Sequence, residues 1–349
     1  MDARKRRAIA LQLKRGIGNI VRGTVLKREF LLPFVGVYHI NYRCNGRCNF
    51  CSRAEDISQS NERCVDLGRV ETIFRSLARL TPTLYITGGE PTIEPNIGEV
   101  LRLAREIGFW PICINTNAII LDKRPDVPRY ADKVVVSLHA GTAQKHAEVL
   151  GVSVRQGERV FDNIVLTSQV AKSYGNTLSI NCVLTGDNIE EARGVLDFCL
   201  AHEIPIAVVP AIQRHMPMIA SGEADKLRNY RDFLGEVIRL KTQQPDAVVG
   251  TKSYLEHIHR LGGFQCRPSG IITISPEGHV VNPCDYKYHT VSKTLGETNG
   301  TEPIESQLRH HLNFASAYEV CGGNCLKMCY IEPALVLQNP LLAIGEFLS

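Results

Sequence analysis

Three cysteines, Cys44, Cys48 and Cys51, stand in a C-x3-C-x2-C spacing directly after an apolar stretch. Three thiolates can bind three irons of a 4Fe-4S cluster and leave the fourth iron open, whereas ferredoxin-type electron carriers supply four thiolates to each cluster. An open iron can bind a substrate or a cosubstrate. The spacing therefore predicts an iron-sulfur site with one coordination position kept for another molecule.

Two other uses of these thiols are a structural zinc site and burial as inert side chains. Zinc favours paired C-x2-C units and four closed ligands. Neither a second pair nor a C-x2-C and H-x3-H combination lies near this run. The cluster is therefore the favoured interpretation.

Length and composition are those of an ordinary globular chain. The protein has 349 residues, 44% hydrophobic and 22% charged, enough for one large domain and a small one. Eight of its 12 cysteines form two groups with metal-ligand spacing, and no signal peptide is recognised, so we expect a cytoplasmic protein with metal sites. The net charge of +4 and the lack of interleaved aromatic and basic residues argue against a nucleic-acid partner.

Positive charge is concentrated in residues 1–33, which we expect to form a basic amphipathic segment. A helical projection sets the apolar residues Ile9, Leu13, Ile17 and Ile20 opposite the basic residues Arg4, Arg7, Lys14, Arg15 and Arg22. Such a helix can make peripheral contact with an anionic membrane, at the inner surface in a cytoplasmic protein, although glycines weaken it. The alternatives are a helix packed on the protein's own barrel and a frayed basic terminus.

Residues 34–225 alternate short apolar strands with helix-like segments, the pattern of parallel β/α units. Helices are expected between the strands, including one that begins after an N-cap at Asp187 or Asn188. Six strands predict an α/β fold with a partial (β/α)6 barrel, and a closed (β/α)8 barrel is the alternative. The strand candidates lie within residues 35–42, 83–88, 111–117, 133–140, 178–186 and 205–212, and the clearest helices within 66–80, 97–107 and 189–202.

The cysteine triplet, with Phe50 before its third cysteine and the run TGGEPTI that starts at Thr87, resembles the radical S-adenosylmethionine (SAM) superfamily. The resemblance implies that Cys44, Cys48 and Cys51 ligate a 4Fe-4S cluster whose open iron holds the amino and carboxylate groups of SAM. One electron would then cleave SAM to methionine and a 5'-deoxyadenosyl radical, which takes a hydrogen atom from substrate. An electron donor such as flavodoxin or ferredoxin is an implied partner.

The same resemblance assigns contacts with SAM to the first loops of the barrel. Phe50 would pack near the adenine. Gly88, Gly89 and Glu90 match the family's GGE run, where backbone and carboxylate receive the methionine amino group. Glycines at this position let the backbone approach closely.

Later strands carry further residues implied by the resemblance. Ser137 matches a position that contacts the SAM ribose or carboxylate in relatives, and Asn181 matches an inward asparagine. His139 replaces an aspartate common in relatives and is either a substrate contact or a surface-capping histidine. Arg214 and His215 would close over the adenine or the substrate.

Strand periodicity sorts the remaining candidates, because alternate residues face the same side. Asn115 and Asn117 should face the barrel lumen, and Asn115 is a candidate SAM contact. Cys113 shares their side, so it is a candidate hydrogen-atom donor to a substrate radical, with a plain core thiol as the alternative. Cys182 should point outward, and we expect it and Cys199 to be buried structural thiols.

A second cysteine group resembles the SPASM or shorter twitch extension of radical SAM enzymes, in which a β-hairpin holds auxiliary clusters. Here the hairpin would be GIITISPEGHVV, turned at Pro276–Gly278. The resemblance implies one auxiliary 4Fe-4S cluster, ligated by two cysteines beside the hairpin and two or three of the last triplet; structural zinc is the alternative. The cysteines are Cys266, Cys284, Cys321, Cys325 and Cys329.

We therefore expect a core barrel over residues 34–225, a helical linker over 226–262 and an auxiliary-cluster domain over 263–349. The favoured function is a radical SAM enzyme, an oxidoreductase that functionalises an unactivated C–H bond of a peptide or protein. A lipid or a cofactor precursor is the alternative substrate. A non-catalytic iron-sulfur redox protein is the alternative class, but it would have no use for an open iron beside a GGE run.

The two cysteine groups predict about eight irons and eight sulfides in the anaerobically reconstituted protein. Replacing Cys44, Cys48 and Cys51 together by alanine should remove about four irons and all SAM cleavage. Iron and sulfide analysis with detection of 5'-deoxyadenosine checks both outcomes, and a triple variant that still cleaves SAM would refute the assignment.

Overall fold

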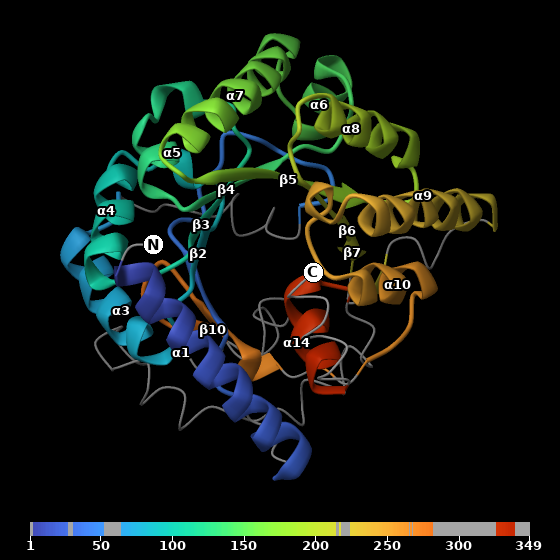
Figure 1. Ribbon diagram of the computed structural model, residues 1–349. Helices are drawn as coiled ribbons and strands as arrows, with labels where there is room; N and C mark the ends of the chain where they lie inside the picture. Colours follow the sequence, from blue (N-terminus) through green and yellow to red (C-terminus); the bar gives the residue numbers. More distant parts are fainter. Residues whose placement is uncertain are drawn as a thin grey trace.

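The computed structural model describes residues 3–26, 31–51, 64–213, 216–217, 224–264, 266, 268–281 and 326–338. Its centre is an eight-stranded sheet in the order β10-β9-β1-β2-β3-β4-β5-β6. Neighbouring strands from β9 to β6 pair in parallel, whereas β10 runs antiparallel to β9. Figure 1 shows the sheet curving into an open barrel.

The strands confirm the predicted α/β partial barrel, because six consecutive parallel strands form at the six expected segments. Those strands are β1 (Val35–His39), β2 (Leu84–Thr87), β3 (Ile112–Thr116), β4 (Lys133–Ser137), β5 (Thr177–Leu184) and β6 (Ile206–Pro210). A C-terminal hairpin adds β9 (Ile271–Ile274) and β10 (Val280–Val281), and a separate ribbon contains β7 (Ile212–Gln213) and β8 (Met216–Pro217).

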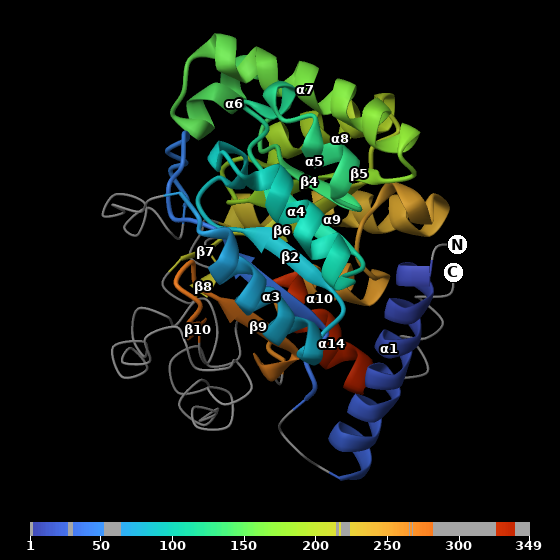
Figure 2. The ribbon, with the colours of Figure 1, turned by 90° about the vertical axis from the view of Figure 1, so that its left-hand side faces the viewer.

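Helices connect the strands and cover the outer face of the sheet (Figures 1 and 2). The α-helices are α1 (Ala3–Ile20), α3 (Leu67–Leu80), α4 (Ile97–Ile107), α5 (Asp126–Tyr130), α6 (Ala143–Leu150), α7 (Val154–Ser173), α8 (Ile189–Ala201), α9 (Ala224–Gln243), α10 (Lys252–Arg260) and α14 (Met328–Gln338). Short helical turns are η1 (Val21–Val25), η2 (Pro91–Ile93), η3 (Leu121–Lys123), η5 (Pro245–Ala247) and η6 (Pro268–Gly270).

Local signals explain where several helices begin and end. The Asp66 side chain accepts the N–H of Arg69 at the start of α3. Helix α8 follows Asn188, as expected, but the Asn188 side chain accepts the N–H of Thr185 and so fixes the preceding turn rather than capping the helix. Helix α4 ends at Gly108, whose φ of +105° suits glycine.

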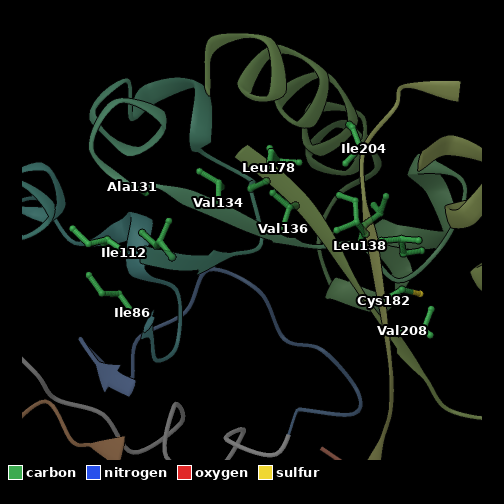
Figure 3. Close-up of a cluster of buried hydrophobic side chains, with 14 of the residues drawn as sticks. Ile86, Ile112, Ala131, Val134, Val136, Leu138, Leu178, Cys182, Ile204 and Val208 are labelled. Atoms are coloured by element: carbon green, nitrogen blue, oxygen red, sulfur yellow. The ribbon is translucent and has the colours of Figure 1, made fainter. Parts of the chain in front are cut away.

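Alternate strand residues form the main core between sheet and helices. Figure 3 shows Ile86, Ile112, Val136, Cys182 and Val208 within this layer, and each of the five is fully buried. The opposite parity of the same strands therefore faces the lumen. Cys182 points outward as expected, and Cys199 is also buried.

The C-terminal part of the chain returns to the first strand of the barrel. The expected hairpin forms, with Gly278 at φ +94° in its turn, but β9 pairs in parallel with β1 and so extends the barrel sheet. Helix α14 lies between the two edges of the sheet (Figure 1). The Tyr254 hydroxyl contacts carbonyls of both Val208 and Leu326, which ties α14 and β6 together through α10.

Helix α1 is fastened to the outside of the barrel by the largely buried carboxylate of Asp132. Asp132 is 10% exposed and accepts hydrogen bonds from the Arg4 guanidinium at 2.6 and 3.1 Å, from Arg105 at 3.2 Å and from the N–H of Ile112 at 2.8 Å. No helix among the described residues is both long and apolar enough to cross a bilayer. One side of α1 therefore packs on the barrel, and peripheral contact of the N-terminal segment with a membrane stays a prediction.

Asp132→Ala should lower the free energy of unfolding by about 2–3 kcal/mol, because it removes the acceptor shared by Arg4, Arg105 and the Ile112 N–H. Glu71→Ala is the matched control, since it removes an exposed ion pair with Arg75 and should cost less than about 1 kcal/mol. Anaerobic urea unfolding of the two variants measures the difference; equal losses would contradict a special role for Asp132.

Candidate functional site

The cysteine triplet lies in the loop after β1, at the carboxyl end of the parallel strands. Cys44, Cys48 and Cys51 are all partly exposed. Burial raises the pKa of the Cys44 thiol to about 11 and that of Cys48 to about 12, and nearby thiols of the triplet add to both rises. The thiols of the triplet therefore lie within electrostatic range of one another.

The donor set fits a 4Fe-4S cluster. Cluster ligands are thiolates, and thiols with raised pKa values need cationic iron beside them to ionise at neutral pH. The Gly46 N–H donates to Cys44 Sγ at 3.3 Å, and Asn117 Nδ2 lies 3.9 Å from the same atom. Among the described residues no three metal-binding side chains surround a single ion position; a cluster spreads its thiolates over separate irons and does not require that arrangement.

Gly88 and Gly89 press against the backbone of the cysteine loop. Gly88 has a φ of +140°, and a Cβ there would lie 2.2 Å from the Asn41 carbonyl; one on Gly89 would lie 2.0 Å from the Arg43 carbonyl. The N–H groups of Gly89 and Glu90 donate to these two carbonyls at 2.8 and 2.7 Å. The predicted close approach exists, but it is to the chain's own loop. Contact with the methionine amino group stays a prediction.

The Glu90 carboxylate joins the end of β2 to the end of β3. It is 1% exposed and accepts the N–H and hydroxyl of Thr92 at 2.9 and 2.5 Å, the Thr116 hydroxyl at 2.7 Å and the Asn117 N–H at 2.6 Å. Burial raises the pKa of Glu90, and the four hydrogen bonds oppose that rise. Both oxygens are engaged within the chain, so the geometry gives Glu90 a positioning role; its contact with SAM stays a prediction.

Three polar residues line the lumen beyond the cysteine loop. Strand pairing sets Ser137 directly opposite Asn181 and Asn115 opposite Val135. Asn115, Ser137 and Asn181 are partly exposed, whereas their neighbours on the other face of the sheet are buried in the core. The Oδ1 atom of Asn115 is buried and accepts no hydrogen bond from the part of the chain described, so it can accept one from a bound molecule.

His139 packs edge-on against Phe50, with ring centroids 4.9 Å apart, and is 3% exposed. The surface-capping alternative for His139 is therefore wrong. The Val183 N–H donates to its Nδ1 at 3.2 Å, so a neutral ring carries its proton on Nε2. Burial, and then His146, lower the pKa of His139 to about 3, which keeps the imidazole uncharged at neutral pH. Its contact with substrate stays a prediction.

Cys113 faces the lumen directly opposite Tyr85 on β2. Burial raises the pKa of Cys113 to about 11, so the sulfur keeps its hydrogen at neutral pH. The pKa of Tyr85 is raised by burial and then by the charges of Cys113 and Cys329. Cys329, in the first turn of α14, therefore lies within electrostatic range of the lumen wall.

The described residues contain only some of the other expected site residues. Cys266 is partly exposed and lies just before η6, and Cys329 is exposed. The expected residues that lie outside the described part of the chain are Arg214, His215, Cys284, Cys321 and Cys325.

Residues that hold the cysteine loop were missing from the sequence candidates. Asn117 donates its Nδ2 to Asn45 Oδ1 at 2.7 Å, and a buried Glu94 is paired with Arg43. Periodicity placed Asn117 in the lumen, but no sequence signal indicated its partner on another loop. Glu94 follows η2 and resembles any surface carboxylate in the sequence.

The sequence comparisons agree with this geometry. Residues 38–199 match the radical SAM superfamily model. The probable GTP 3',8-cyclase of Metallosphaera sedula is 29% identical over 181 residues, which cover 50% of this chain and 54% of that protein. The probable GTP 3',8-cyclase of Saccharolobus solfataricus is 22% identical over 77% of this chain and 89% of its own. The chain thus spans about half the length of the first of these relatives.

Solved structures share the fold at low sequence identity. SuiB of Streptococcus suis bound to its precursor peptide SuiA is 19% identical, with a TM-score of 0.61 over 86% of this chain and 69% of that one. The anSMEcpe enzyme with bound AdoMet is 14% identical, with a TM-score of 0.59 over 91% of this chain and 100% of its own. These likenesses concern the fold alone.

Glu90→Gln should weaken SAM binding about ten- to a hundredfold and leave the iron content unchanged. Thr116→Val distinguishes a positioning role of Glu90 from direct contact with SAM, because it removes one hydrogen-bond donor to the carboxylate and leaves the Glu90 charge in place. If Glu90 acts by positioning, calorimetry should show weaker SAM binding in both variants, together with a lower Tm. Weaker binding in Glu90→Gln alone, at an unchanged Tm, would instead support direct contact with the amine.

Proposed function

Because this chain belongs to the radical SAM superfamily through residues 38–199, we propose that it is an enzyme that cleaves SAM reductively and abstracts hydrogen from an unactivated C–H bond. When bound, a reduced 4Fe-4S cluster at the cysteine triplet would supply the electron that splits SAM into methionine and a 5'-deoxyadenosyl radical. One observation carries the proposal: the N–H groups of Gly89 and Glu90, in the GGE run, donate hydrogen bonds to backbone carbonyls of the cysteine loop.

The chain's own residues would hold SAM along the carboxyl ends of the strands. Asn115 Oδ1 offers a buried acceptor, and the Ser137 and Asn181 side chains lie beside each other at the next two strands. Phe50 would pack on the adenine, with the neutral His139 ring fixed behind it. Arg214 is proposed to close over the same pocket. These polar groups would fix the orientation of the bound ligand.

An auxiliary 4Fe-4S cluster at the C-terminal cysteines is the second part of the proposal. Cys329 supports it, because it lies within electrostatic range of Tyr85, which stands between Val37 and Cys113 in the barrel sheet. A cluster ligated there would lie beside the lumen, where it would either accept an electron from the substrate radical or bind substrate directly. The remaining ligands would be Cys266, Cys284 and either one or both of the other cysteines of the last triplet.

The substrate we propose is a small cofactor precursor rather than a peptide or protein. Resemblance of the C-terminal cysteines to SPASM enzymes favours a peptide, but the solved peptide-modifying structures share only the fold with this chain. The curated relatives, found by sequence, are named for a reaction of GTP. A lipid is the remaining alternative.

The reaction class is tested by incubating the anaerobically reconstituted protein with SAM and dithionite and measuring 5'-deoxyadenosine. Cleavage that requires the cysteine triplet supports the proposal, whereas a cluster-loaded protein that never cleaves SAM would be an electron carrier. GTP and other nucleotides, added in parallel with candidate peptides, should raise SAM consumption if the substrate is a nucleotide-like precursor.

Cys113→Ala should preserve 5'-deoxyadenosine formation and abolish or divert product, if the Cys113 thiol returns a hydrogen atom to the substrate radical. Cys182→Ala is the matched control, because it removes an equally small buried thiol on the core side of β5. Product is measured by mass spectrometry with whichever substrate stimulates SAM consumption. A normal yield from Cys113→Ala would leave Cys113 as a plain core thiol.

A further inference from the structure

Helix α1 turns its polar side to the barrel. Besides the Arg4–Asp132 pair, Gln12 Nε2 donates to the Thr83 hydroxyl at 2.5 Å and Arg15 donates to the Arg79 carbonyl at 3.0 Å. Asn19 exchanges two hydrogen bonds with the backbone of Leu32. The basic residues expected on one outward face therefore lie on different sides of the helix. Arg4 and Arg15 face the barrel, whereas Arg7 and Lys14 are exposed to solvent.

The opposite side of the same segment is apolar and exposed. Leu13 is 63% exposed, Ile17 65%, Val21 43% and Val25 70%. Because these residues recur every fourth position, they form one continuous row, which we call the outer stripe. A surface helix of a globular protein normally buries its apolar row and exposes its polar side. In α1 and η1 the apolar row is exposed, and the polar side of α1 faces the barrel. Figures 1 and 2 both show α1 along the periphery of the molecule.

The described segment that carries the outer stripe has charged side chains of one sign. Residues 3–26 contain no aspartate or glutamate. Arg6, Arg7 and Lys14 are exposed near the stripe and lie outside the buried polar face. An apolar row bordered by cations is suited to the boundary between acidic lipid headgroups and acyl chains.

We propose that the outer stripe binds the surface of an anionic lipid bilayer and holds the barrel there through the polar face of α1. A second copy of the chain is a poorer occupant, because pairing two stripes would bring two sets of like charges together. The proposal does not depend on the reaction that the barrel performs.

The test uses the full-length, cluster-loaded protein and sedimentation with vesicles of phosphatidylglycerol and phosphatidylcholine. At low salt the protein should sediment with vesicles that contain phosphatidylglycerol. It should dissociate from them at high salt and should not sediment with vesicles of pure phosphatidylcholine. Leu13→Ser/Ile17→Ser/Val25→Ser should reduce the partition coefficient at least about tenfold. Leu166→Ser/Leu200→Ser, which removes exposed leucines from α7 and α8, should leave it unchanged.

A charge-reversed variant separates electrostatics from apolar burial. Arg6→Glu/Arg7→Glu/Lys14→Glu should abolish the preference for phosphatidylglycerol, and Arg155→Glu on α7 is its control. Trp110, the chain's single tryptophan, lies under the Lys5 ammonium at 4.9 Å, so unchanged Trp110 emission would show that α1 stays docked in each variant.

Failure of the wild-type protein to sediment with anionic vesicles at low salt would overturn the proposal. So would equal loss of binding in the stripe variant and its leucine control. A stripe variant that changes the mass in analytical ultracentrifugation, while vesicles have no effect, would identify a second copy as the occupant. None of these outcomes depends on SAM cleavage, which should remain normal in all the variants.

Discussion

The candidate site depends on one buried carboxylate. The buried Glu90 carboxylate accepts four hydrogen bonds, two from Thr92 in η2 and two from Thr116 and Asn117 at the end of β3, and the Glu90 N–H donates to the Arg43 carbonyl of the cysteine loop. A charged acceptor removed from solvent must have its hydrogen bonds met within the protein. The hydrogen bonds of Glu90 therefore link the cysteine loop to the ends of β2 and β3.

Much of the barrel and part of the site could be predicted from the sequence. Six apolar runs at β/α spacing gave the strands, because parallel strands buried by helices must be rich in aliphatic residues. Period-two alternation correctly separated the lumen-facing Asn115 from the core-facing Cys182. The cysteine spacing and the GGE run singled out two loops that lie together in the structure, since both are local signals contained in a few consecutive residues.

Contacts between distant segments could not be predicted in this way. Nothing in the sequence near Asn117 indicates that its amide reaches Asn45, because that contact exists only after β1 and β3 have joined the sheet on either side of β2. Helix α1 gives a second example. Its projection showed two faces, but Asp132, many residues away along the chain, decided which face would meet the barrel. Periodicity defines the faces of a helix, whereas the complementary surface selects between them.

The pairing of β1 with β9 affects how the molecule is made. Val35 pairs with Ile271, so one edge of the strand that leads to the cysteine loop stays uncovered on the ribosome until β9 has been synthesised. An unpaired apolar strand is prone to aggregate, and contacts so distant in sequence form late. Assembly of iron and sulfide at the loop is therefore expected to follow the synthesis of β9, and a chaperone that shields β1 would raise the yield of cluster-loaded protein.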